Sequence, residues 1–413
     1  MTSAPPSDVR TPTLKDIEAA REALDGVSIY TPMEGARWLS SMAGGPVKIK
    51  AENLQRTGSF KIRGAYLRMS RLSAEEKAAG VVAASAGNHA QGVALAAQML
   101  GLQATVFMPE GAPIPKENAT RAYGADVRFS GVSIDEALVS AREFSAETGA
   151  VLIHPFDHVD IVTGQGTCGL EIVEQCPDVR TVVVPCGGGG FLAGIATAVK
   201  ALRPEARVVG VQAAGAAAYV DSLAEGKPVP LASMATIADG IAVGCPGAVP
   251  FRAVQEHVDD FVTVSEDSLS RALLMLLERA KLVVEPAGAA AVAAMLDEPH
   301  AFETPAVVVL SGGNVDPLLM MRVIRQGLAA AGRYLYFRAR IPDAPGGLAR
   351  LLNELASVQA NVLDVVHERT SAQLHLDEVE VQLQVETRGP EHAERVLQHL
   401  RDGGYPVARR PAD

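Results

Sequence analysis

Residues 181–190 read TVVVPCGGGG, and the chain continues into the apolar, alanine-containing stretch Phe191–Leu202. The β-branched run Thr181–Val184 predicts a short buried strand, and the stretch after the glycines predicts a helix. Glycines at this position leave backbone N–H groups uncovered at the positive end of the helix, where they can bind a phosphate. A tightly packed structural turn is the alternative. The stretch therefore predicts a strand–loop–helix unit with Gly187–Gly190 as a candidate anion site.

The same alternation of short β-branched runs and Ala/Leu-rich stretches extends in both directions, from Val81 to about Val315. Most of these runs are continuously apolar, as buried parallel strands are, and strands alternating with helices form right-handed βαβ units. The expected strands are Val81–Ala84, Ala104–Met108, Val127–Phe129, Val151–Ile153, Thr181–Val184, Arg207–Val211 and Ala306–Leu310, and the expected helices include Ala90–Leu100, Phe191–Leu202 and Leu269–Ala280. The pattern predicts an α/β protein with open parallel sheets.

Three of the expected strands end in loops that carry glycine, serine or asparagine. Val81–Ala84 runs into Ser85–His89 (SAGNH), and Ala306–Leu310 runs into Ser311–Asn314 (SGGN). Ligands of open α/β sheets bind at the carboxyl ends of the strands, so these loops and the tetraglycine loop are expected to form one composite site. The amides of Ser85–His89 either hold a substrate carboxylate or belong to a simple capped turn.

The tetraglycine loop also has to be compared with the dinucleotide fingerprint. Gly188, Gly190 and Ala193 fit G-x-G-x-x-A, but that fingerprint requires an acidic residue about 20 positions later, at the end of the next strand. The next strand ends near Val211-Gln212, without Asp or Glu, and the chain has no G-x-x-x-x-G-K-S/T motif. A smaller phosphate-bearing cofactor is therefore favoured over a dinucleotide.

A lysine follows serine and phenylalanine in the stretch TGSFKIRGA, residues 57–65. Ser59 is expected to cap a helix that runs through Met69, which places Lys61 in the first turn, where a charged ammonium opposes the helix dipole. Most lysines are solvated at the surface, and that interpretation remains open from position alone. The functional alternative is a lysine that forms a Schiff base, for which the neighbouring Phe60 supplies an apolar environment.

The C-terminal part has a different pattern. Strands are expected at Tyr334–Ile341, Asn361–His367, Glu378–Glu386 and Tyr405–Ala408, and helices at Gly347–Ser357 and Glu391–Leu400, the latter with Pro390 at its start. The order βαββαβ is ferredoxin-like, and the clean alternation in Glu378–Glu386 indicates a sheet with one wetter face. We expect a separate C-terminal domain that begins near residue 330.

Composition excludes several classes of protein. The 413 residues carry a net charge of −11 and only 4% aromatic residues, which argues against a nucleic-acid-binding surface. No signal peptide and no apolar stretch of about 18 residues is visible, so no membrane partner is expected. The four cysteines form no C-x-x-C pair, which fits a cytoplasmic protein without a disulfide framework or a zinc site.

Taken in order, the SFK, SAGNH, tetraglycine and SGGN motifs resemble those of the fold-type II (tryptophan synthase β-like) pyridoxal-phosphate enzymes. The resemblance is closest to the threonine dehydratases (threonine ammonia-lyases), with serine dehydratases and serine racemases as relatives, and covers about residues 14–326. It implies a catalytic region 1–330 made of a large domain (about 1–52 and 160–330) and a small domain (about 53–159). The stretch DAPGGL, residues 343–348, resembles an ACT domain, which implies a regulatory domain at 333–413.

The resemblance also implies a role for each matching residue. Lys61 would hold pyridoxal 5'-phosphate covalently as a Schiff base and act as the catalytic base. The other implied cofactor contacts are Phe60 on the pyridine ring, Asn88 on its phenolic oxygen, Gly187, Gly188, Gly189 and Gly190 on the phosphate, and Ser311 on the pyridine nitrogen. Ser85, Ala86, Gly87 and Asn88 would receive the substrate carboxylate.

The implied reaction is dehydration and deamination of L-threonine to 2-oxobutyrate and ammonia, and also of L-serine to pyruvate. Racemase relatives have a second serine where this chain has Ala86, so elimination without efficient racemisation is expected. Some relatives bind a divalent cation with two carboxylates, where this chain has Gln212 and Ala218, so no metal site is expected. Glu285 resembles an acidic residue near the family's site, but a helix-start role is equally open.

Other functions remain in view. One is dehydration of another β-hydroxy amino acid, such as 3-hydroxyaspartate, and another is a non-catalytic amino-acid sensor built on the C-terminal domain. A dehydrogenase is disfavoured by the missing ribose-binding acid. The ACT-like domain is expected to bind isoleucine or valine near Pro345–Leu348 and Asn361–Val362, although it could serve dimerisation alone. A homo-oligomer, dimer or tetramer, is expected.

Overall fold

The computed structural model describes residues 10–369, 375 and 377–409 of the chain. The chain folds into two compact units, Met1–Pro317 and Leu318–Asp413. The division falls before the boundary expected near residue 330, at the start of helix α14 (Pro317–Ala330). The two units are described separately below.

The first unit contains a six-stranded sheet with the strand order β1-β2-β10-β7-β8-β9. Every neighbouring pair in it is parallel except β1–β2. The strands are β1 (Met33–Gly35), β2 (Val47–Ala51), β7 (Thr181–Pro185), β8 (Arg207–Ala213), β9 (Asp260–Val264) and β10 (Ala306–Leu310). The helices of this part are α1 (Leu14–Ala23), α2 (Arg37–Ala43), α8 (Val159–Gln175), α9 (Gly190–Leu202), α10 (Ala218–Glu225), α11 (Ala248–His257), α12 (Glu266–Met275) and α13 (Pro286–Asp297).

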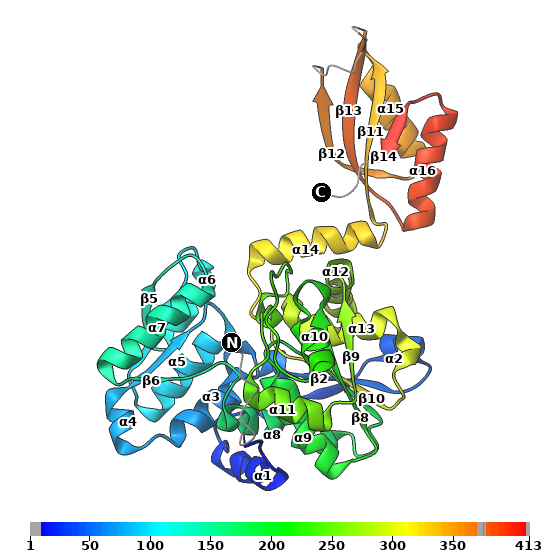
Figure 1. The fold of residues 1–413 in the computed structure, drawn as a ribbon. Coiled ribbons are helices and arrows are strands. Elements are labelled where there is room, and N and C mark those ends of the chain that lie inside the picture. Colours follow the sequence, from blue (N-terminus) through cyan, green and yellow to red (C-terminus); the bar gives the residue numbers. More distant parts are fainter. Residues whose placement is uncertain (1–9, 370–374, 376, 410–413) are drawn as a thin grey trace. The chain divides into compact units, whose positions relative to one another are not determined.

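A second, four-stranded sheet in the same unit is parallel throughout, with the order β5-β4-β3-β6. Its strands are β3 (Val81–Ala84), β4 (Ala104–Met108), β5 (Asp126–Phe129) and β6 (Val151–Leu152), and its helices are α3 (Lys61–Ser70), α4 (Ala74–Ala79), α5 (Asn88–Leu100), α6 (Ile114–Ala122) and α7 (Ile134–Thr148). The smaller lobe, blue to cyan in Figure 1, stands beside the larger, mainly green one. The expected pair of open α/β sheets is confirmed.

The centre of the large lobe is built from apolar strands and very small helix residues. All five residues of β7 are buried, as expected for a strand covered on both faces. Helices α8 and α9 approach so closely that a Cβ on Gly194 would lie 2.5 Å from the backbone nitrogen of Gly166. This close packing holds α9, and with it the tetraglycine loop at its start, firmly against the sheet.

Three strands of the large sheet, β1, β2 and β9, were not expected from the sequence, and several boundaries differ. The helix expected at Leu269–Ala280 is α12 followed by a π-helical turn at Leu276–Ala280. Lys281, directly after this turn, has φ +60. The chain therefore changes helical geometry just before the buried segment that carries Glu285.

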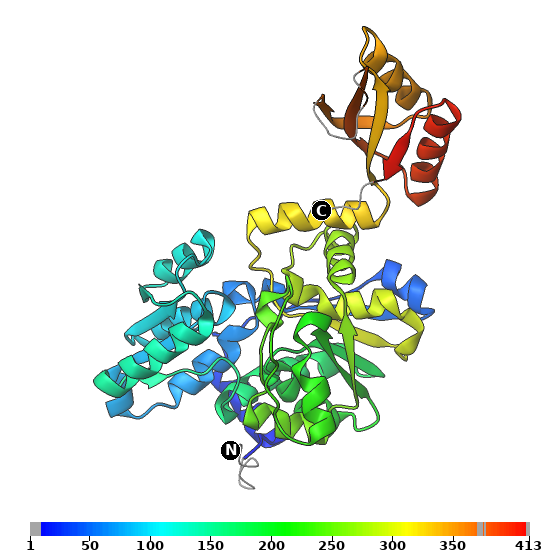
Figure 2. The same ribbon diagram turned by 45° about the horizontal axis from the view of Figure 1, so that its top comes forward.

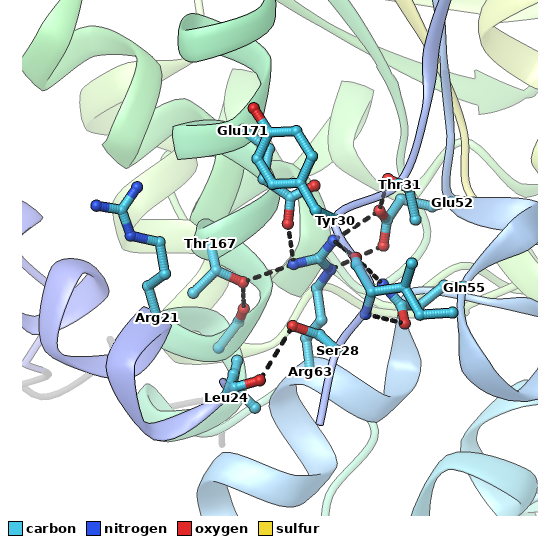
Figure 3. Close-up of polar contacts among 12 residues, drawn as sticks. Arg21, Leu24, Ser28, Tyr30, Thr31, Glu52, Gln55, Arg63, Thr167 and Glu171 are labelled. Carbon is cyan, nitrogen blue, oxygen red and sulfur yellow. Dashed lines mark hydrogen bonds and ion pairs between the residues drawn. The ribbon is translucent and has the colours of Figure 1, made fainter. Parts of the chain in front are cut away.

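A cluster of four buried charges connects α3 to β2 and α8. Figure 3 shows the part of it in which Arg63 lies between Glu52 and Glu171. Arg63 donates to both carboxylate oxygens of Glu52 at 2.8 Å and pairs with Glu171 at 2.6 Å. Lys50 donates to the other oxygen of Glu171 at 2.5 Å and to the carbonyl oxygen of Thr31 at 2.8 Å. Because buried charges are costly unless paired, this cluster constrains how α3 lies against the large lobe.

The second unit contains an antiparallel sheet with the order β12-β13-β11-β14. Its elements are β11 (Tyr334–Pro342), α15 (Gly347–Ser357), β12 (Asn361–Glu368), β13 (Glu378–Glu386), α16 (Pro390–Asp402) and β14 (Val407–Arg409). Apolar residues of α15 and α16 share one core with alternate residues of the strands, so both helices cover one face (Figures 1 and 2). The ferredoxin-like βαββαβ order is confirmed, with the last strand two residues later than expected.

Within the described ranges, no helix is both long and apolar enough to cross a lipid bilayer. All four cysteines are free thiols in the structure.

Candidate active site

The loops that follow the strands of both lobes line a single large cavity of about 930 Å³. Its walls include Ser85–His89 from the small lobe, and Gly187–Gly190 and Ser311 from the large lobe. Phe60 and Lys61, at the start of α3, line the same cavity. The structure thus brings together the composite site that was expected from three separate strand ends.

Lys61 is the first residue of α3, and its amine reaches the cavity wall. Nζ donates to the carbonyl oxygen of Pro155 at 3.0 Å and lies 5.1 Å from the centre of the Phe60 ring. Desolvation by the surrounding protein lowers the Lys61 pKa to about 8, although the nearby Glu285 carboxylate works in the opposite direction. An amine with such a pKa is partly unprotonated near neutral pH, so it can act as a nucleophile or a base.

The expectation that Ser59 caps α3 is wrong. Ser59 has an extended backbone and forms a β-bridge with Gly312, and Phe60 occupies the capping position without a side-chain hydrogen bond. The backbone N–H of Phe60 also donates to the carbonyl oxygen of Ser311 at 3.3 Å. The start of α3 is therefore set by pairing with the loop after β10, which places Phe60, the residue before Lys61, beside Ser311.

The tetraglycine loop is packed so tightly that two of its residues must be glycine. A Cβ on Gly188 would lie 2.5 Å from the Phe156 ring, and one on Gly189 would lie 1.8 Å from the Tyr219 hydroxyl oxygen. Gly189 also has φ +95, a conformation that L side chains rarely adopt. Helix α9 begins at Gly190, so the amides of its first turn, which have no intrahelical partners, lie at the cavity directly after three glycines that carry no side chains.

Glu285 occupies the N-cap position of α13, and its side chain lines the cavity. It precedes that helix without a capping hydrogen bond, is only 3% exposed, and accepts from Asn88 Nδ2 at 2.5 Å. Asn88 Oδ1 in turn accepts from Asn314 Nδ2 at 2.8 Å, so these three side chains connect the loops of both lobes. Burial, and then the negative charge of Asp239, raise the Glu285 pKa to about 7.

Two histidines near Lys61 are neutral. Burial lowers the pKa of His89 to about 3, and its Nε2 lies 2.7 Å from the carbonyl oxygen of Ile153. Burial also lowers the pKa of His154 to about 4, and its Nδ1 accepts from the backbone N–H of Asp157 at 2.8 Å. His89 is therefore a buried histidine that faces the backbone of the small lobe through Ile153.

Several residues of the cavity wall had not been identified from the sequence. They include Phe156, His154, Lys116 and Asp239. None of them belongs to a glycine-rich turn, and Lys116 lies on a helix, so no local motif marked them. In the part of the chain that the structure describes, no group of three or more His, Cys, Asp or Glu side chains is arranged to hold a metal ion.

The chemistry of the site fits a phosphate-bearing aldehyde cofactor. Lys61, Gly187–Gly190 and Phe60 line one cavity, where they would offer an amine to the aldehyde, main-chain donors to the phosphate and an aromatic ring to the cofactor's ring. Such a set, at the carboxyl ends of parallel strands, defines a pyridoxal-phosphate enzyme. The sequence profile of the family described as "Pyridoxal-phosphate dependent enzyme" matches residues 25–312, and the chain belongs to this family.

Within that family the chain is similar to lyases that act on threonine. It is 44% identical to the L-threonine ammonia-lyase of Thermotoga maritima over 395 residues (96% of this chain and 98% of that protein). It is 47% identical to that of Geobacter sulfurreducens over 369 residues (89% and 92%). It is also 43% identical to the L-threonine dehydratase catabolic TdcB of Staphylococcus aureus over 324 residues (77% and 94%).

Solved structures show the same similarity. The processed form of threonine deaminase isoform 2 from Solanum lycopersicum has a TM-score of 0.72 and 39% identity, covering 79% of this chain and 98% of that one. Maize serine racemase also has a TM-score of 0.72, with 34% identity, and covers 78% and 99%.

Proposed function

We propose that this protein removes water and then ammonia from L-threonine, yielding 2-oxobutyrate, with pyridoxal phosphate as its cofactor. The observation that carries the proposal is the meeting of Lys61, Gly187–Gly190 and Ser85–Asn88 around one cavity. The similarity to L-threonine ammonia-lyases over nearly the whole chain supports the choice of threonine. L-Serine, which lacks only the γ-methyl group, is the proposed second substrate and would yield pyruvate.

The cofactor's place follows from the donors in the cavity. Gly187–Gly190 would hold its phosphate at the N-terminus of α9, and Ser311 and Asn88 would contact its ring, which Phe60 would pack against. Phe60 is itself fixed by stacking on Phe191, with ring centres 3.9 Å apart. Bound pyridoxal phosphate supplies the electron sink that makes the α-proton of an amino acid acidic.

Lys61 is the proposed base for that α-proton. Its lowered pKa, about 8, gives a substantial unprotonated fraction near neutral pH, which general base catalysis requires. Ser311 would offer only a hydroxyl to the pyridine nitrogen, which cannot enforce protonation as a carboxylate would, and this would favour elimination over transamination. The aminocrotonate released from the site hydrolyses to 2-oxobutyrate and ammonia.

The charges of the cavity disfavour 3-hydroxyaspartate as the substrate. A second substrate carboxylate needs a second cation, whereas the described acidic groups of the wall are Asp135, Asp239 and Glu285. A non-catalytic sensor is disfavoured by the environment of Lys61. Burial lowers the pKa of this lysine, which helps a lysine that reacts but gives no benefit to one with a purely structural role.

The second unit is proposed to be an ACT-like regulatory domain that binds isoleucine or valine near Pro345–Leu348 and Asn361–Val362. Strand β12 is an edge of the described sheet, and an open edge can pair with another copy of the chain, which supports a homo-oligomer. A cytoplasmic location fits a chain whose substrate and effector are free amino acids.

The test is an assay of the purified holoenzyme with L-threonine. We expect formation of 2-oxobutyrate, a change in the visible absorbance of the cofactor on adding threonine, and labelling of Lys61 after borohydride reduction. Lys61→Ala should abolish both the reaction and the labelling. A wild-type protein that forms no 2-oxobutyrate and shows no spectral change with threonine would refute the proposal.

A further inference from the structure

Lys116 is a cavity residue to which the proposed reaction assigns no role. It lies on α6 in the small lobe, and its Nζ pairs with Asp239 Oδ2 of the large lobe at 2.7 Å. The Lys116 side chain is 12% exposed and that of Asp239 is 56% exposed. The ion pair therefore crosses the cavity with its ammonium end enclosed and its carboxylate end in water.

The Lys116 ammonium stands next to the loop Ser85–Asn88. A Cβ built on Gly87 would lie 3.9 Å from Lys116 Nζ. Apart from Gly87 and its two neighbours in the chain, no other heavy atom would lie within 4 Å of that Cβ. The space above Gly87 is thus open, and a positive charge borders it. A group that occupies this space can contact the loop amides and the ammonium together.

The charges of the wall make Lys116 the natural partner of an anion. Of the described lining residues, Lys61 and Lys116 are the lysines, and no arginine is among them. In the proposed function Lys61 binds the cofactor, so Lys116 is the lysine of the wall that is available to an anionic substrate group. An ammonium has three N–H donors, and the bond to Asp239 uses one of them.

We infer that Lys116 binds the α-carboxylate of the amino-acid substrate at the Ser85–Asn88 loop, with Asp239 orienting the ammonium from the opposite side of the cavity. The inference rests on the proposed function, because it takes this loop as the carboxylate site. It makes Lys116 a determinant of specificity for free α-amino acids over their uncharged amides.

The experiment titrates the holoenzyme with glycine and, separately, with glycinamide, and follows binding in the absorbance of the cofactor. Glycine has no leaving group, so the titration reports binding alone. Lys116→Met should weaken glycine binding about tenfold or more, as expected for loss of a hydrogen bond to a charged group, and change glycinamide binding less than about twofold. Lys116→Arg should retain most of the affinity for glycine, and the exposed Lys227→Met is the matched control.

Two results would overturn the inference. Equal weakening of both ligands would mean that the Lys116–Asp239 pair only holds the lobes together, and unchanged glycine binding would mean that Lys116 does not contact the carboxylate. Parallel measurement of 2-oxobutyrate formed from L-threonine by the wild type separates the two proposals. A wild type inactive on threonine that still shows the glycine pattern would refute the proposed substrate but not the role of Lys116.

Discussion

Burial shifts the pKa values of Lys61 and Glu285 toward neutral pH from opposite directions. The surrounding protein disfavours the charged form of each, which lowers the Lys61 pKa to about 8 and raises the Glu285 pKa to about 7. Each charge partly offsets the effect of burial on the other. Two groups whose pKa values lie near neutral pH therefore line one cavity, and Asn88 connects the Glu285 carboxylate to the loop after β3.

The raised pKa of Glu285 predicts a pH-dependent stability. An acid with a raised pKa stabilises the fold fully below its ordinary pKa of 4.5, and this contribution is lost as the pH rises through about 7. Glutamine cannot ionise, so the Glu285→Gln variant does not lose this contribution. Its free energy of unfolding, relative to that of the wild type, should therefore rise by about 2–3 kcal/mol between pH 5 and pH 8. Urea denaturation of the cofactor-free protein at both pH values measures this, with the exposed Glu22→Gln as the control. An advantage that is equal at both pH values would contradict the assignment.

Ala86 predicts which product the enzyme does not form. In the proposed site, Ala86 would lie on the face of the substrate opposite Lys61, where an alanine has no proton to give, so L-serine should yield pyruvate without D-serine. Ala86→Ser supplies a hydroxyl there and should raise D-serine formation at least about tenfold, since a positioned acid or base contributes roughly 10²–10⁴-fold. Chiral chromatography of the reaction mixture measures it. Fast racemisation by the wild type would show that another group serves that face.

At the scale of elements, the buried charge cluster predicts how α3 is held. Arg63→Met leaves Glu52 and Glu171 buried without their main partner and should cost about 3–5 kcal/mol of unfolding free energy. Arg121→Met, which removes a more exposed i,i+4 pair with Glu117, is the matched control and should cost less than about 1 kcal/mol. Urea denaturation compares the two. Equal small losses would mean that α3 is held by apolar packing alone.

The tetraglycine loop predicts a second effect at this scale. The Cβ of a Gly189→Ala variant must displace Tyr219 or the loop, and the φ of +95 at this position adds backbone strain. We expect the variant to lose about 1–3 kcal/mol of unfolding free energy through overpacking and to bind the cofactor more weakly. Gly226→Ala is the control, because it has a similar φ of +68 but nothing within 4 Å of its Cβ. Absorbance titration with pyridoxal phosphate should show at least about tenfold weaker binding for Gly189→Ala alone. Equal affinities would mean that the loop's geometry does not govern cofactor binding.

The continuously apolar strands could be predicted from the sequence, and the less regular ones could not. Strand β2, VKIKA, was missed because Lys48 and Lys50 interrupt its apolar pattern. Lys50 is fully buried there only because Glu171, on the distant helix α8, neutralises it. Strand β9 was missed because it is a short edge strand in which the exposed Asp260 and Thr263 interrupt the apolar residues. Local patterns do not contain such long-range compensation.

The same limit applies to the site. The loops around Asn88, Gly187–Gly190 and Ser311 follow strands and carry glycines, so the topology of parallel sheets predicts that they meet. Lys116 and Asp239 reach the cavity from a helix and a short 3-10 turn, and only the folded arrangement brings them to within 2.7 Å of each other. Motifs therefore predict the proposed cofactor site, whereas the ion pair between Lys116 and Asp239 is visible only in the tertiary structure.

At the scale of the whole molecule, the two units have separate cores. The apolar cluster of the second unit is built from its own sheet and helices α15 and α16. The Staphylococcus aureus relative aligns along 94% of its own length with 324 residues of this chain, which leaves little of that protein to correspond to the remainder. A catalytic region that folds without the C-terminal sheet is therefore expected.

Truncation after Ala330 tests this division. The shortened protein should keep threonine deamination within about twofold of the full chain, because each of the proposed catalytic residues lies before Pro317, in a unit with its own core. The full chain should respond to L-isoleucine or L-valine, with D-isoleucine as the control, and the truncated chain should not. Rates of 2-oxobutyrate formation with and without each amino acid measure both effects. A truncated protein that still responds would place the effector site in the catalytic unit, and one that folds but has no activity would show that catalysis requires the C-terminal unit.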